Sequence, residues 1–455
     1  MRVTLRFSVC CLVVLAVLTC TATSLKAAEP LAFRHAVDLA LHHSTTMAIA
    51  SADQARAHAA VQAGRNLFLP RVEAGSGVAY TYGYPLSLEG SAPTVFNVTT
   101  QQFLFNPSQH EFLRSYQSEW KATTFTSDDK KNQVILETAT DYIELDTVTS
   151  MLSILQQQNE AVQRAEQVVG QRVKEGVDSE VELTRAKLAS ARVRMKAAQA
   201  QTTADLLRER LSQLTGLPVA EIQTASESIP KLPGVDQNED LMARALEYSP
   251  ALKGANEHAE ARHFTAKGEH KALYPSIDLA GQYGYFAKYN HFQDYFSGTR
   301  KFRSNNAVYG MVIRIPIFNS AQKAQAMAAD QEALIARKQA EDVKDQVSSD
   351  TLRLQRSLRQ LAEAKEVARL EHELAQSDVE AAQARLQAGT ATIKDEQQAR
   401  VHEHETYINL LDASFTLDKT QMELMRSTGE LQHWAIAPDT TTPNSPPSTT
   451  TPNHP

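Results

Sequence analysis

The spacing of apolar residues changes its period twice in each half of the chain, and both halves change in the same order. A helical spacing over 36–41 recurs over 241–246. An alanine-rich helical stretch follows each of these and is ended by Pro70 or Pro275. The period then becomes two, which is typical of strands. Each half is therefore predicted to begin with two helices and to continue into a β-hairpin.

The first predicted strand of each half has one apolar face that ends in tyrosines. The even positions from 72 to 84 are mostly apolar or aromatic, and so are the odd positions from 277 to 285. With their return strands, these segments predict hairpins at about 71–105 and 276–317. The tyrosines could be ordinary strand formers, but their place favours an aromatic girdle at a membrane interface. The girdle would consist of Tyr80, Tyr82, Tyr84, Tyr283 and Tyr285.

A very long stretch without proline follows each hairpin, over about 108–217 and 319–437. Gly176 and Gly389 lie near the middle of these stretches, so each one predicts two long helices joined at a glycine-containing turn. The first helix of each pair would have about 65 residues and a length of about 100 Å. Apolar residues recur every seven positions, which predicts antiparallel coiled-coil packing. The clearest series is Val148, Leu155, Val162 and Val169.

The two halves are copies of one another. Pro70 falls on Pro275 at an offset of 205, and the two turn glycines coincide at an offset of 213. The offset changes inside the hairpin, so the second copy has a longer loop between its strands. We expect a first repeat over 29–230, a second repeat over 231–437 and a pseudo-symmetric architecture.

The amino terminus indicates export. All three cysteines lie in the first 20 residues, beside an apolar run that follows two arginines and is too short to span a membrane. This predicts a secretory signal peptide over 1–28, cleaved between Thr23 and Glu29. Lipidation of Cys20 is the alternative, although Thr19 makes the lipoprotein motif poor. The tract at 438–455 is rich in proline and threonine and is predicted to be disordered.

Composition excludes several function classes. Of the 455 residues 42% are hydrophobic, which favours elongated helices over one compact core. The net charge of -7 is spread along the chain without a basic stripe, which argues against nucleic acid as a partner. No catalytic triad, Cys/His pair or phosphate-binding loop is recognisable, so neither an enzyme nor a cofactor is expected. The segment 402–405, His-Glu-His-Glu, lacks metalloprotease spacing and predicts a solvated helix face, with no metal site.

Four apolar-faced strands in an exported chain create a hydrogen-bonding problem. In lipid every backbone group needs a partner, so the sheet must close, and four strands are too few to do so. Three chains would supply twelve strands, within the range of outer-membrane barrels. The alternative is an exported periplasmic coiled-coil scaffold without a pore. That alternative explains the heptads but not two hairpins with apolar faces.

Several short motifs, in the same order in both copies, resemble the TolC-like outer-membrane efflux family. The resemblance implies an outer-membrane homotrimer with a twelve-stranded β-barrel and a long periplasmic α-helical barrel. It implies a passive exit duct for a tripartite efflux pump or a type I secretion system. The partners would be outer-membrane lipid, a periplasmic adaptor and an inner-membrane transporter of the RND, ABC or MFS class. The motifs are Ala36–Leu41, Leu69–Pro70, Leu214–Pro218, Pro316–Asn319 and the turns Arg172–Gly176 and Arg385–Gly389.

The resemblance also suggests a gate. In the family, acidic residues six positions beyond each turn glycine line the closed end of the duct, and here these are Glu182 and Asp395. Three copies would give two carboxylate rings that favour cations. Both residues could instead be ordinary acids at helix starts. Arg185 and Gln398 occupy equivalent positions and mark a further difference between the repeats.

A tyrosine and an arginine that latch the gate in one family member are replaced here by Leu386 and Ala391, so the same latch is not expected. The two turns are the predicted contacts for the adaptor. They comprise Gly176, Val177, Asp178, Ser179, Gly389, Thr390, Ala391 and Thr392.

Overall fold

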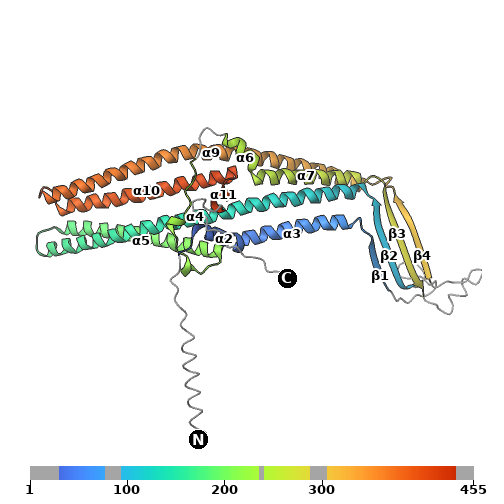
Figure 1. Cartoon of the computed structure of the whole chain (residues 1–455), viewed down its shortest axis with the longest axis horizontal. Coiled ribbons are helices and arrows are strands. Elements are labelled where there is room, and N and C mark those ends of the chain that lie inside the picture. The colour runs from blue at the N-terminus through green and yellow to red at the C-terminus, as the bar shows by residue number, and fades with distance from the viewer. Residues whose placement is uncertain (1–29, 77–93, 235–239, 287–304, 437–455) are drawn as a thin grey trace, which may run out of the picture.

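The fold is a long bundle of helices with a four-stranded sheet at one end (Figure 1). The computed structural model describes residues 30–76, 94–234, 240–286 and 305–436. The predicted signal peptide, the Pro/Thr-rich tail and Tyr80, Tyr82 and Tyr84 lie outside these ranges. None of the described helices is both long and apolar enough to cross a membrane.

Both repeats contain the elements that the periodicity predicts. The first repeat contains α2 Phe33–His43, α3 Thr45–Asn66, β1 Arg71–Gly75, β2 Thr94–Phe105, α4 Pro107–Lys174, α5 Glu180–Thr215 and the 3-10 turns η1 Val219–Glu221 and η2 Ser226–Ser228. The second contains α6 Leu241–Tyr248, α7 Pro250–Lys271, β3 Ser276–Phe286, β4 Asn305–Arg314, α9 Ser320–Gln387, α10 Ile393–Thr428 and α11 Leu431–Ile436. The prediction of mainly helical, internally duplicated structure with two hairpins is thus confirmed. β4 ends at Arg314, before the predicted limit of 317, and Pro316 has no N–H for a strand ladder.

The long helices begin at equivalent polar caps. Asn106 accepts a hydrogen bond from the Gln109 N–H at the start of α4, and Asn319 accepts one from the Gln322 N–H at the start of α9. Both α4 and α9 have 68 residues, close to the predicted length. The duplication therefore includes the start and the length of each long helix.

The helices next to the sheet form a single continuous wall. α4 contacts α3 on one side and α7 on the other, and α7 in turn contacts α9. Each of these four helices leads into or out of one strand, and the strand order β1-β2-β3-β4 follows the same sequence across the wall (Figure 1). β1 and β4, like α3 and α9, are the edges of this wall.

The sheet has the same hairpin register in both repeats. Arg71 lies opposite Gln101, and the residues that correspond to them, Ser276 and Arg314, also lie opposite each other. Directly paired residues share a face. One face is mainly polar, and the other is mainly apolar with Thr100, Gln102 and Asn305 as its polar members. The apolar face carries Val72, Ala74, Phe96, Val98, Ile277, Leu279, Tyr283, Tyr285, Ala307, Tyr309, Met311 and Ile313.

The main hydrophobic core lies at mid-length, where α2, α4, α5 and α11 meet. There the ring of Phe33 packs edge to face against Tyr142 and Trp434, with centroid distances of 5.4 Å to Tyr142 and 5.2 Å to Trp434. The Tyr142 hydroxyl donates to the Leu31 carbonyl at 2.5 Å and accepts from the Ala225 N–H at 2.8 Å. This core joins the start of the first repeat, the segment between the repeats and the last described helix, so it holds the two helix pairs in place.

Candidate gate at the helical tip

The two glycine turns lie together at the end of the molecule farthest from the sheet (Figure 1). Gly176 has φ 77° and Gly389 has φ 74°, a left-handed conformation that favours glycine. The residue that follows each glycine donates its backbone N–H to the carbonyl of an arginine in the last turn of the preceding helix. Val177 donates to Arg172 at 2.8 Å, and Thr390 donates to Arg385 at 2.9 Å. The turns are therefore built in the same way in both repeats.

Asp395 is bound to its own turn. The Thr392 N–H donates to Asp395 Oδ2 at 2.8 Å, and the Thr392 hydroxyl donates to the same oxygen at 2.7 Å. The Asp395 N–H returns a bond to the Thr392 hydroxyl, which completes a capping box at the start of α10. These bonds hold the pKa of Asp395 below its ordinary value. The alternative role, an acid at a helix start, is thus present at Asp395, and its part in a gate stays a prediction.

Glu182 has different neighbours. Its carboxylate pairs with Arg185 of the same helix at 2.6 Å. It also lies 3.9 Å from the ammonium of Lys394, at the start of α10. The residue of the first repeat that corresponds to Lys394 is Val181, so this contact between the repeats has no counterpart with the repeats exchanged. The acid of the first repeat therefore joins the two helix pairs at the tip, whereas the acid of the second repeat closes its own turn.

The first turn has a salt bridge that the sequence reading missed. Arg172 Nε donates to Asp178 Oδ2 at 2.8 Å, and its Nη2 donates to Oδ1 at 3.2 Å, a two-pronged contact across the turn. In the second turn Arg385 is kept, but Ala391 stands where the carboxylate would be. Opposite charges on both sides of the turn glycine were the signal that could have revealed this pair.

Comparison with known proteins settles the family. The family model described as outer membrane efflux protein matches residues 36–217 and 241–430, most of the chain. The chain belongs to the outer membrane efflux protein family. Members of this family are outer-membrane channels and not enzymes, so the resemblance noted in the sequence is confirmed and the pore-less scaffold is not favoured. Among curated proteins, a sequence search found no significant match.

Solved structures support the same fold. The CmeC outer membrane channel of Campylobacter jejuni has a TM-score of 0.75 at 14% identity, over 90% of this chain and 87% of that chain. The outer membrane protein VceC of Vibrio cholerae has a TM-score of 0.67 at 18% identity, over 89% of this chain and 96% of that chain. The open state of the MtrE outer membrane channel of Neisseria gonorrhoeae has a TM-score of 0.69 at 17% identity, over 88% of this chain and 90% of that chain.

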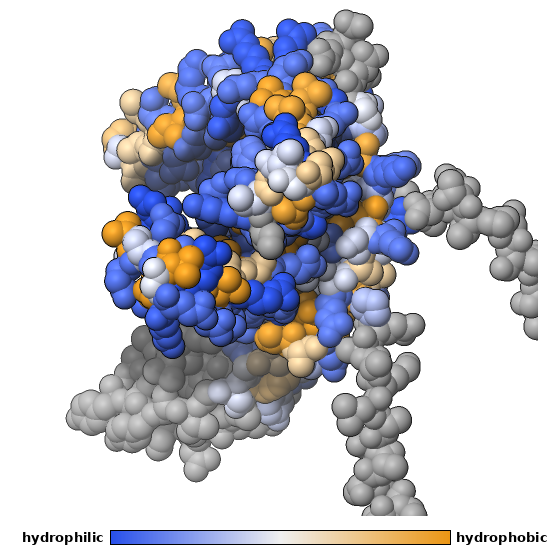
Figure 2. Space-filling model, turned by 90° about the vertical axis from the view of Figure 1, so that its left-hand side faces the viewer, coloured by the Kyte–Doolittle hydropathy of each residue, from blue (hydrophilic) through white to orange (hydrophobic). Residues whose placement is uncertain are grey.

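The tip of this outer membrane efflux protein presents apolar side chains among charged ones (Figure 2). Val177 in the first turn is 62% exposed, and Val181, at the start of α5, is 59% exposed. The corresponding residues of the second repeat are Thr390 and Lys394. The two turns predicted to contact an adaptor thus differ in polarity. Contact with an adaptor stays a prediction for both.

Tyr283 and Tyr285 lie on the apolar face of the sheet, near the end of β3 farthest from the helices. They are 40% and 44% exposed. Their position fits an aromatic girdle, which stays a prediction.

The segment 402–405 is only partly on a solvated face. His402 and Glu405 are exposed, but Glu403 and His404 are half-buried, and Glu403 faces α9. There Glu403 lies 3.8 Å from His372 and 3.6 Å from His404. Across the described part of the chain, no group of three or more His, Cys, Asp or Glu side chains is arranged to hold a metal ion.

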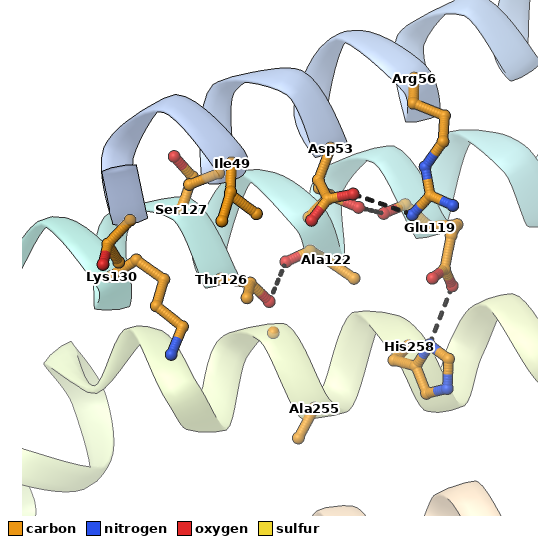
Figure 3. Close-up of a pocket in the computed structure, with 14 residues that line it drawn as sticks. Ile49, Asp53, Arg56, Glu119, Ala122, Thr126, Ser127, Lys130, Ala255 and His258 are labelled. Carbon is orange, nitrogen blue, oxygen red and sulfur yellow. Dashed lines mark hydrogen bonds and ion pairs between the residues drawn. The ribbon is translucent and has the colours of Figure 1, made fainter. Parts of the chain in front are cut away.

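A groove of about 580 Å³ crosses α4 between α3 and α7 (Figure 3). Glu119 of α4 pairs with His258 of α7 at 2.9 Å, and Asp53 pairs with Arg56 on α3 at 3.1 Å. The hydrogen bond and charge of His258 hold the pKa of Glu119 below its ordinary value, against the opposing effect of burial. The groove thus lies where the first repeat meets the second and is bridged there by the contact between Glu119 and His258.

Proposed function

We propose that three copies of this chain form an exit duct, with a twelve-stranded barrel in the outer membrane and a helical tube in the periplasm. The sheet with one apolar and one polar face carries this proposal, because among the residues that the structure describes neither edge strand, β1 or β4, has a partner on its outer side. In lipid such edges must be paired. Twelve strands from three copies would pair every edge, with the apolar face toward lipid and the polar face toward the lumen.

The wall order supports closure of the helical part as well. Inside one chain, α4 of the first repeat packs against α7 of the second. In a closed ring, α9 would meet α3 of the next copy in the equivalent way, because the repeats correspond helix by helix. Six near-equivalent helix sets would then surround one lumen.

The duct would act as a passive conduit for cargo delivered by other proteins. We propose that a periplasmic adaptor contacts the two turns at the tip and links the duct to an inner-membrane transporter. The exposed Val177 and Val181 would supply apolar contacts of the kind that protein interfaces use at their centres. Photo-crosslinkers placed at Val177 and Thr390 are expected to capture the adaptor. Labelling of neither turn in cells that express the whole assembly would contradict this assignment.

The central experiment purifies the full chain from outer membranes in detergent and measures its mass and its conductance in planar bilayers. We expect a trimer that forms cation-preferring channels. A protein recovered without detergent from the periplasm, with no conductance, would overturn the duct and favour the pore-less scaffold.

A further inference from the structure

A buried carboxylate on the polar face of the sheet ties three strands together. Asp278 of β3 has a fully buried side chain. Its Oδ2 accepts a hydrogen bond from Gln101 of β2 at 3.4 Å and forms an ion pair with Arg314 of β4. Gln101 and Arg314 lie diagonally across from Asp278, each on the strand next to β3. The polar face therefore has a connected row of side chains near the end of the sheet that adjoins the helices.

The duplication relates the members of this row to one another. Glu73 is the first-repeat counterpart of Asp278, at the offset of 205, and Gln101 is the counterpart of Arg314, at the offset of 213. Between β2 and β3 the Cα partner of Gln101 is Ala280, two residues after Asp278. Applied to the next junction around a ring, the same register places Arg314 opposite Gly75 of the following copy. Glu73 of that copy then occupies the diagonal position that Asp278 has beside Gln101.

We propose that Arg314 joins adjacent copies through an ion pair with Glu73 of the next copy. The pair would lie on the lumen face at the base of the barrel. The inference rests on the trimeric duct proposed above and adds the strand register and the residues that seal each junction. The four residues would then recur around the barrel in the order Glu73, Gln101, Asp278, Arg314, with the new pair joining Arg314 of each copy to Glu73 of the next.

The chemistry of the two side chains fits this role. A guanidinium has five N–H donors. Within the part of the chain that the structure describes, Arg314 has Asp278 as its one hydrogen-bond partner, and its side chain is 57% exposed. Glu73 is paired with Arg71 at 2.8 Å. The Glu73 side chain is 60% exposed and the Arg71 side chain 79% exposed, so the Glu73 carboxylate can accept a second donor. At the proposed junction, the Arg314 guanidinium on β4 would thus face a carboxylate of opposite charge, Glu73 on β1.

The first experiment tests the register by cysteine crosslinking. The described chain contains no cysteine, since all three lie in the first 20 residues. Gln102 of β2 lies opposite Leu279 of β3. Their counterparts in the other repeat are Ile315 and Ala74, so Ile315 is expected to lie opposite Ala74 of the next copy. Ala74→Cys with Ile315→Cys is expected to give covalently linked trimers on mild oxidation. The matched control, Ala74→Cys with Ile313→Cys, keeps the same face but is two residues out of register, and is expected to crosslink weakly.

The second experiment tests the ion pair itself. Glu73→Gln is expected to lower the dissociation temperature of the trimer by about 2–4 °C, whereas Arg71→Gln is expected to leave it nearly unchanged. In a protein that already carries Arg314→Gln, adding Glu73→Gln is expected to cause no further fall in the dissociation temperature, because the two residues act through one shared contact.

The outcomes separate the two levels of the proposal. A trimer that crosslinks through the control pair, or that loses equal stability from Glu73→Gln in both backgrounds, overturns the Arg314 junction and leaves the duct intact. An unmodified chain that forms no trimer overturns the duct itself.

Discussion

Single buried polar groups decide how the mid-length core holds together. Tyr142 is fully buried, and its hydroxyl joins the start of the first repeat at Leu31 to the segment between the repeats at Ala225 and Ser228. A buried N–H or carbonyl that loses its partner costs about 1–3 kcal/mol. The contacts of this one hydroxyl therefore contribute an appreciable share of the local stability.

Tyr142→Phe is expected to destabilise the protein by about 1–3 kcal/mol, because it removes the hydroxyl and leaves both backbone groups without a partner. Thermal unfolding followed by circular dichroism in detergent measures the effect. Tyr116→Phe is the control, since that tyrosine is 39% exposed and should tolerate the change. Equal melting temperatures for the Tyr142 variant and the unmodified protein would show that the hydroxyl contributes nothing.

The contribution of Asp141 to the free energy of unfolding depends on pH. Burial raises its pKa to about 6, against the opposing effect of the Arg210 charge. Below about pH 4 the carboxyl is protonated in both the folded and the unfolded chain. Above that pH the unfolded chain ionises first, so the contribution of Asp141 becomes increasingly unfavourable until the pH passes about 6.

Asp141→Asn is therefore expected to raise the melting temperature by about 2–4 °C at pH 7.5 and to leave it unchanged near pH 4. Asp146→Asn serves as the contrast, because Asp146 accepts hydrogen bonds from Thr224 and Ser226 and its replacement should destabilise the protein. A shift of the Asp141 variant that is the same at both pH values would rule out a titration effect.

At the scale of elements, the sequence predicted most of what the structure shows. The change of period marked helix and strand, and proline-free length marked α4 and α9, because both signals are local. The contacts at the tip were not predictable in this way. Lys394 reaches Glu182 only because α10 starts beside α5, and the number of residues between them in the sequence carries no information about that distance.

The turn glycines provide a test at this scale. At Gly176 and Gly389 an added Cβ would meet nothing within 4 Å, so the cost of alanine there comes from the positive φ alone. We expect Gly176→Ala and Gly389→Ala to cost about 1 kcal/mol each and to speed hydrogen exchange in the last turns of α4 and α9. Gly310→Ala is the matched control, since its Cβ would also meet open space but its φ is not positive. Unchanged exchange at both turns would contradict this account.

At the scale of the whole molecule, duplication turns local patterns into one continuous wall. Each helix beside the sheet continues into or from one strand, and the two hairpins share one register. If the two repeats were identical, every contact between neighbouring repeats around the ring would be the same. The differences between the repeats therefore indicate where one junction or one turn has a function that its counterpart lacks, and at the tip these differences centre on Glu182, Lys394 and Asp395.

The gate prediction separates charge from contact at the tip. If the acids line the closed end, Glu182→Ala with Asp395→Ala removes both carboxylate rings and is expected to raise single-channel conductance or reduce cation preference in planar bilayers. Lys394→Gln removes the contact with Glu182 while keeping all the acids. It is expected to raise conductance through a looser tip and to strengthen cation preference, because a positive charge beside the ring is lost.

Asp395→Asn is the informative third variant. Asp395 is bound by Thr392 at the start of α10, so the variant keeps an acceptor for the cap while removing the charge. If Asp395 serves only its own turn, this variant leaves selectivity unchanged while Glu182→Gln alters it. If both acids face the lumen, the two variants reduce cation preference to a similar extent. Unchanged conductance and selectivity in the double alanine variant would exclude both acids from the gate.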